Sequence, residues 1–132
     1  MVEAKGALAS LGSTGAQLVF EAPKPMVPSP TYRCVDWYLS ENPICKAGLA
    51  IDKQTMLALR APVLKEMETL AAANTKVRVW DPLPVLCPGP VCQAMDGDKP
   101  IFFDRHHVST HGDQMLRNSF DHAFSAWFTG SS

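Results

Sequence analysis

The sequence predicts an α/β fold with a parallel sheet and flanking helices, and two observations carry this prediction. Twice along the chain, a helical stretch leads through a turn into a short apolar strand, at residues 17–21 and 76–80. This repeated order of helix, strand and loop is typical of a crossover between parallel strands. Each strand also ends at a proline and continues into a long proline-bearing loop, and such loops line ligand crevices in open α/β sheets.

Length and composition limit the classes of protein to consider. The 132 residues suffice for one domain with a core, and a hydrophobic fraction of 46% beside a charged fraction of 19% is ordinary for a globular chain. A formal net charge of −1 gives no electrostatic basis for binding nucleic acid. The N-terminus has no basic region followed by an apolar segment, so no export signal is expected. We expect a single domain over residues 1–132.

The first half of the chain predicts, in order, a helix over 3–11, a strand over 17–21 and a proline loop over 23–30. Asp52 is a suitable N-cap for a long helix that reaches Asn74. Pro62 lies inside this helix and should kink or split it. Apolar side chains recur there at three- and four-residue steps and predict one buried face, formed by Met56, Leu59, Val63, Met67 and Leu70.

The second half begins with the strand at 76–80 and a proline and cysteine loop over 84–98. A very short extended segment at 101–103 follows the loop. Thr110 and Asp113 then resemble a capping box that opens the last helix. The apolar face of that helix should pack on the sheet, and it consists of Leu116, Phe120, Ala123, Phe124 and Trp127.

The four cysteines form two local pairs, Cys34 with Cys45 and Cys87 with Cys92, each within a proline-bearing loop. We expect two loop-closing disulfides, because irregular loops gain most from a crosslink. Free thiols and a zinc site are the alternatives. Zinc is disfavoured because neither pair has the separation of a zinc knuckle and no histidine closely flanks either pair.

A candidate site lies at Asp104 and His107, directly after the apolar segment at 101–103. In a turn, this spacing lets the carboxylate fold back onto the imidazole ring. A carboxylate on Nδ1–H fixes the tautomer and leaves Nε2 free as a base for a hydroxyl nucleophile. The alternative interpretation of so short a motif is a surface turn with solvated polar residues.

The remaining polar residues predict no second site. His107 and His111 are four residues apart, but no His-Glu-x-x-His arrangement accompanies them, so no metal is expected. The sequence has no Gly-rich phosphate loop, and no cofactor is expected. We expect His106 to point away from His107, and His122 to lie on the surface. Ser109 is explained by capping of the last helix, and Ser13 belongs to a glycine turn that precedes a strand, whereas a serine elbow follows one.

Several features of the chain together resemble the tail of an SGNH domain, namely Asp81-Pro82, Cys87, Cys92, the block at 102–109 and Gly112. The closer resemblance is to the SGNH domain fused behind membrane-spanning acyltransferase domains, in bacterial proteins that O-acetylate O-antigen and other surface glycans. That family ends in Asp-x-x-His followed by Leu-Ser, and Val108 replaces the leucine here. Arg60 leading into a helix also fits the family pattern.

The resemblance implies that Asp104 and His107 are the acid and base of a catalytic triad that acts on a glycan or an acyl ester. The family's serine comes from a Gly-Asp-Ser block, and its oxyanion-hole glycine and asparagine come from two further blocks. None of these blocks precedes Leu18 here. The expected fold is therefore a partial three-layer, flavodoxin-like SGNH domain whose N-terminal strands are missing.

The same resemblance places the intact protein outside the cytoplasm, as part of a periplasmic or otherwise extracytoplasmic membrane protein. We expect this chain alone to lack esterase and acetyltransferase activity, because it has no serine block for His107 to activate. The alternative function is that of a non-catalytic α/β module that binds a glycan or a partner protein through its proline and cysteine loops.

Overall fold

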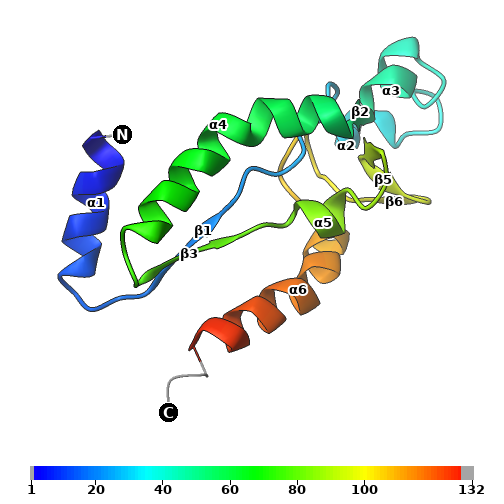
Figure 1. Cartoon of the computed structure of the whole chain (residues 1–132). Helices are drawn as coiled ribbons and strands as arrows, with labels where there is room; N and C mark the ends of the chain where they lie inside the picture. The colour runs from blue at the N-terminus through cyan, green and yellow to red at the C-terminus, as the bar shows by residue number, and fades with distance from the viewer. Residues whose placement is uncertain (1, 129–132) are drawn as a thin grey trace.

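The computed structural model describes residues 2–128, and a pair of parallel strands lies at its centre. Strand β1 (Leu18–Glu21) follows helix α1 (Val2–Gly12), and it pairs in parallel with β3 (Val77–Trp80) over their whole lengths. Helix α4 (Lys53–Ala72) connects the two strands, and Figure 1 shows the strand pair running between α4 and the last helix, α6 (Thr110–Phe128). The predicted α/β class and the parallel crossover are therefore confirmed.

The sheet is narrower than the fold that the sequence predicts. Within residues 2–128, the parallel sheet has two strands, and the other strands form two separate antiparallel pairs. One is β2 (Ala50–Asp52) with β4 (Val91–Gln93), and the other is β5 (Met95–Asp96) with β6 (Lys99–Pro100). The described residues thus support a mixed α/β fold but do not contain a broad three-layer parallel sheet.

Helix α4 begins as predicted but buries a different set of side chains. The backbone N–H of Thr55 donates to the carboxylate of Asp52 at 2.9 Å, which is the expected N-cap. The helix runs through Pro62 without a break, because Pro62 is exposed and solvent can hydrate the carbonyl that its ring leaves unpaired. Of the two outcomes predicted at Pro62, a kink or a split, the split does not occur, and Figure 1 shows that the helix axis curves.

The predicted apolar face of α4 is only partly covered. Met56 is buried, whereas Leu59 and Val63 are 62% and 48% exposed. Two strands offer too little sheet to cover a helix of this length, so part of the face remains open. The buried position that sequence periodicity missed is Arg60, which is 2% exposed.

The chain around the two proline loops contains more regular structure than was predicted. The segment after the first loop, predicted over 23–30, carries α2 (Thr31–Cys34) and α3 (Pro43–Gly48), and the second loop, predicted over 84–98, begins within α5 (Leu83–Leu86). Helices of one turn are too short to show a hydrophobic period, so periodicity cannot reveal them. The predicted turn at Asp96-Gly97-Asp98 is present, and Gly97 adopts a φ of 61° that favours glycine.

Both predicted disulfides are present and account for all four cysteines. Cys34–Cys45 joins α2 to α3 over a Cα–Cα distance of 5.3 Å. Cys87–Cys92 joins the end of α5 to β4 over 4.6 Å and lies in a small core with Met56 and Leu83. Free thiols and a zinc site, the two alternatives, are thereby excluded for these residues.

The main core lies where α5 and the segment before α6 meet the first proline loop. Its buried members are Val27, Leu86, Ala94, Ile101, Phe102 and Leu116. Gly112 is part of this contact, because a Cβ added there would collide with the carbonyl oxygen of Ile101. A side chain at Gly112 would therefore push α6 away from the core.

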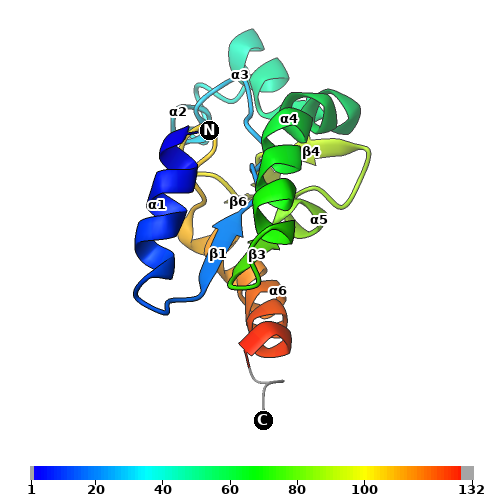
Figure 2. The ribbon, with the colours of Figure 1, turned by 60° about the vertical axis from the view of Figure 1, so that its left-hand side comes forward.

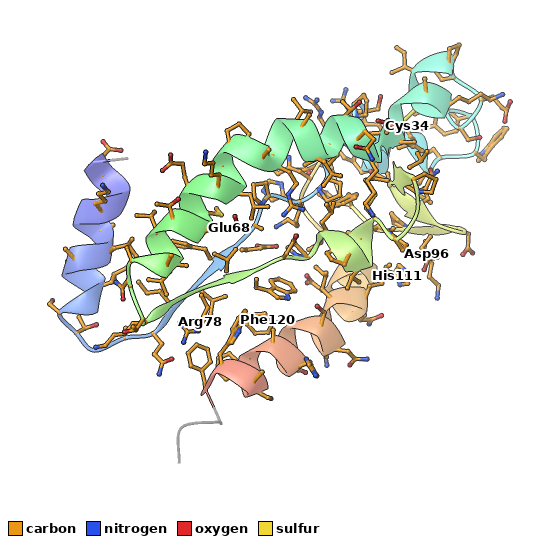
Figure 3. The ribbon with its side chains drawn as sticks, in the orientation of Figure 1. Cys34, Glu68, Arg78, Asp96, His111 and Phe120 are labelled. Atoms are coloured by element: carbon orange, nitrogen blue, oxygen red, sulfur yellow. A yellow bond between two sulfur atoms is a disulfide. The ribbon has the colours of Figure 1, made fainter. Side chains whose placement is uncertain are left out.

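Helix α6 is capped by Ser109, and only its first half is well covered. The N–H of Gly112 donates to the Ser109 hydroxyl at 3.1 Å, which confirms the capping role predicted for Ser109, whereas the capping box predicted to begin at Thr110 was wrong. Leu116 is buried, but Phe124 is 46% exposed. Phe120 points toward β3 (Figure 3), where its ring meets Trp80 edge-on at 5.1 Å between ring centroids. Figure 2 shows the C-terminal half of α6 extending beyond the strand pair.

Candidate active site

The candidate site is a short closed turn between the core residue Phe102 and the start of α6. Phe102 and Val108 form an antiparallel bridge across the base of the turn. Above it, the N–H of Phe103 donates to the carbonyl of His107 at 2.7 Å. The apolar residues at the base fix the turn to the core, and the polar residues between them project outward.

Asp104 folds back onto His107, as the spacing predicts. Its Oδ2 lies 2.6 Å from Nδ1 of the His107 ring. Its Oδ1 accepts hydrogen bonds from the backbone N–H groups of His106 at 2.9 Å and His107 at 2.8 Å. Among the described residues, no side chain is hydrogen-bonded to His107 Nε2, and the His107 side chain is 69% exposed. The hydrogen bond at Nδ1 therefore fixes the orientation of the His107 ring, while Nε2 remains accessible to a substrate or a second side chain.

These hydrogen bonds keep the carboxylate charged. The backbone N–H of His106 has the largest effect, followed by the His107 side chain and the His107 N–H, and together they hold the pKa of Asp104 well below its usual range. An ionised Asp104 keeps the proton of neutral His107 on Nδ1, since Oδ2 can only accept. His107 Nε2 is then a free lone pair that can take a proton from a hydroxyl group.

Lowering the pH is expected to destabilise the fold through Asp104. Because the pKa of this carboxyl is depressed in the folded chain below its ordinary 3.8, its stabilising contribution is present above about pH 4 and is lost as the pH falls further. Urea unfolding at about pH 6 and about pH 3 measures this effect. The midpoint should fall less for Asp104→Asn than for the wild type, whereas the exposed control Asp121→Asn should follow the wild type. An equal fall in urea midpoint for the wild type and for Asp104→Asn would contradict the assignment of this pH dependence to Asp104.

His106 lies beside His107, and the expectation that it points elsewhere was wrong. The centroids of the two rings are 4.1 Å apart, and His106 Nδ1 lies 3.9 Å from Asp104 Oδ1. One ligand atom from each of Asp104, His106 and His107 falls within 4.8 Å of the others, a spacing that a metal ion could bridge. Both carboxylate oxygens already accept N–H groups, so the turn explains this grouping without an ion.

Two of the other polar residues, His111 and Ser109, make contacts that stabilise the fold. His111 Nε2 lies 2.8 Å from Asp96, and this contact ties the first turn of α6 to the β5–β6 hairpin (Figure 3). The Ser109 hydroxyl donates to the carbonyl of Pro100 while it caps α6, so it is not available to His107. His122 is exposed on α6, as expected.

An open cleft of about 370 Å³ adjoins the turn, between the carboxyl end of β1 and the first half of α4. His106 lines it, together with aliphatic side chains that include Leu59 and Val63. Arg60 lies in its wall, and Arg60 Nη2 is 2.9 Å from the carboxylate of Asp81 at the end of β3. Within residues 2–128, none of the three guanidinium nitrogens has a well-directed hydrogen bond, so the contact with Asp81 is an ion pair and not a directed hydrogen bond.

The fold and the site define an α/β protein that presents a histidine oriented by a carboxylate, on the turn before its last helix. The family model described as SGNH domain (fused to AT3 domains) matches residues 3–122. The chain belongs to this family, as the sequence motifs predict. Comparisons with curated proteins and with solved structures find no match.

The family description joins this domain to AT3 domains, which are membrane acyltransferase domains. None of the helices within residues 2–128 is apolar over a length that would span a bilayer.

Proposed function

We propose that this chain supplies the acid–base pair of an SGNH domain that takes part in O-acyl transfer to, or ester hydrolysis on, bacterial surface polysaccharide. The observation that carries the proposal is the 2.6 Å contact between Asp104 and His107, with Nε2 left open. Membership of a family fused to acyltransferase domains supports an acyl group as the chemistry. Two disulfides support an oxidising, extracytoplasmic location.

In this proposal, His107 Nε2 takes the proton of a serine hydroxyl as the serine oxygen attacks the ester carbonyl. His107 then donates that proton to the departing alkoxide, which leaves an acyl-serine. A sugar hydroxyl or a water molecule, deprotonated by the same Nε2, then attacks the acyl carbonyl. The bond from the acyl carbon to the serine oxygen breaks, and His107 returns the proton to the serine oxygen, which restores the serine hydroxyl and the free Nε2. Asp104 holds the ring and stabilises the imidazolium in both steps.

The nucleophile in this mechanism comes from a segment outside these 132 residues. The sequence contains no Gly-Asp-Ser, and the serine nearest to His107 in the sequence is committed to capping. We infer that β1 and β3 are neighbouring strands of a larger three-layer sheet. In that sheet, a further strand pairs with the free edge of β1 and brings the serine to His107.

A second candidate is a non-catalytic module that binds a glycan or a partner protein. It is supported by Trp37, which is 85% exposed on the loop closed by Cys34–Cys45, with the Tyr38 ring packed edge-on against it. Exposed aromatic rings are typical of binding surfaces. Such a module would bind its ligand equally well with or without His107.

Assay against p-nitrophenyl acetate separates the two candidates when this chain alone is compared with a longer form that carries the serine segment. We expect the isolated chain to hydrolyse the ester no faster than its His107→Ala variant, because it lacks the nucleophile and the oxyanion donors. The same residues joined to a Gly-Asp-Ser segment should be labelled at serine by a fluorophosphonate. Strong hydrolysis by the isolated chain, abolished by His107→Ala, would refute the external serine. Absence of labelling in the joined form would favour the binding module.

A further inference from the structure

The turn that carries Asp104 is held from outside by the end of the first proline loop and the start of α2, a segment that we call the strap (residues 27–32). At one end of the strap, the N–H of Val27 donates to the carbonyl of Arg105 at 2.9 Å. In the opposite direction, the Nε–H of Arg105 donates to the carbonyl of Val27 at 3.0 Å. Val27 is fully buried in the main core, so this double contact fixes one side of the turn to the interior.

The other end of the strap holds the opposite side of the turn. The N–H of Tyr32 donates to the carbonyl of Phe103 at 2.9 Å, and the two rings stack with centroids 5.4 Å apart. The guanidinium carbon of Arg33 lies 5.6 Å from the centre of the Tyr32 ring, and its Nε donates to the Tyr32 hydroxyl. The strap is therefore hydrogen-bonded to the turn on both sides of Asp104, at Phe103 and at Arg105.

Thr31 is the strap residue that is hydrogen-bonded to Asp104 itself. Its hydroxyl donates to the Asp104 carbonyl at 2.9 Å, and its backbone N–H reaches the same oxygen at 3.2 Å. Thr31 is fully buried, although it is polar. Its two bonds set the backbone from which the Asp104 carboxylate reaches His107.

We propose that Thr31 is a positioning residue for the Asp104–His107 pair. A buried hydroxyl that holds the Asp104 carbonyl restricts rotation of the Asp104 backbone, and this keeps Oδ2 on Nδ1 and Oδ1 on the two N–H groups of the turn. Thr31 opens α2, and Cys34 in the same helix is bound to Cys45, so the disulfide anchors the residue that holds Asp104. The role in catalysis rests on the proposed function, but the effect on ring geometry does not.

The test uses Thr31→Val in this chain, because valine matches the shape of threonine and replaces its hydroxyl with a methyl group that cannot donate a hydrogen bond. Nitrogen-15 NMR of the labelled His107 ring at about pH 8 reports which ring nitrogen carries the proton. In the wild type, the Nδ1–H form should dominate. We expect Thr31→Val to convert a large part of the ring population to Nε2–H. Amide exchange at His106 and His107 should also accelerate by about tenfold, because their bonds to Oδ1 loosen.

Two controls separate positioning from general stability. Thr31→Ser keeps the hydroxyl and should keep the wild-type tautomer. Thr69→Val removes a hydroxyl that donates to Lys65 within α4, and it should change neither signal. If Thr31→Val does not fold, Thr31→Ala serves the same comparison, since it adds no atom to the site.

An unchanged His107 tautomer in folded Thr31→Val or Thr31→Ala would overturn the proposal, even if the variant were less stable. Loss of the Nδ1–H form in Thr31→Ser to the same extent would also overturn it. Failure of the proposed function, seen as no serine labelling in the joined form, would leave the effect of Thr31 on the tautomer unchanged. The two ideas can therefore fail separately.

Discussion

His107→Ala is expected to lower the rate of ester hydrolysis by about 10⁴-fold in a protein that joins this chain to its serine-bearing segment. Without the imidazole, no group takes the serine proton during attack or returns it to the leaving alkoxide. The loss should fall on kcat, because the ring acts on the reacting atoms and not on distant parts of the substrate. Steady-state hydrolysis of p-nitrophenyl acetate measures it.

The matched control is His122→Ala, which removes an exposed histidine from α6 and should leave the rate unchanged. Asp104→Asn should lose a comparable factor, because an amide can donate to Nδ1 and so favours the wrong tautomer. A loss of less than about tenfold in His107→Ala would show that another group is the base.

Phe102→Ala is expected to destabilise the fold by about 3–5 kcal/mol. Phe102 is the largest fully buried side chain and lies in the main core, between the proline loop and α6. Its removal leaves a cavity beneath the Asp104 turn as well as losing apolar burial. Since small domains are stable by only about 5–15 kcal/mol, urea unfolding should show a large drop in midpoint.

The neighbouring Phe103 provides the control for this prediction. It is 62% exposed, so Phe103→Ala should cost far less, although it removes the same side chain. Its loss is limited to the stacking with Tyr32, which is worth about 1 kcal/mol. Similar midpoints for the two variants would contradict the assignment of Phe102 to the core.

The sequence predicts those features of the molecule that depend on residues close together along the chain. The Asp104–His107 contact spans three residues, the Asp52 cap also spans three, and each disulfide closes a short loop. In such segments, residue type and spacing decide the geometry with little help from the rest of the chain. The contact between Asp104 and His107 was predicted in this way, while its catalytic role remains a proposal.

The parts that the sequence does not predict depend on distant segments. Thr31 is 73 residues from Asp104, and nothing in its surroundings in the sequence marks it as a partner of that residue. The buried Arg60 lies four residues after Met56, on the same face of α4, but its charge kept it out of the apolar pattern, and its partner Asp81 lies in a different segment, after β3. The position of His106 was missed because two adjacent residues in a turn can project to the same side, whereas in a strand they cannot.

The separation between the strap and the turn also bears on how the chain folds. Val27 and Arg105 are 78 residues apart, and loop closure over such a distance is entropically costly and slow. The Asp104 turn can form early from its own hydrogen bonds, but it becomes rigid only when the strap arrives. The candidate site should therefore be among the last regions to reach its final order, and a chain stalled late in folding would have the right residues in a loose arrangement.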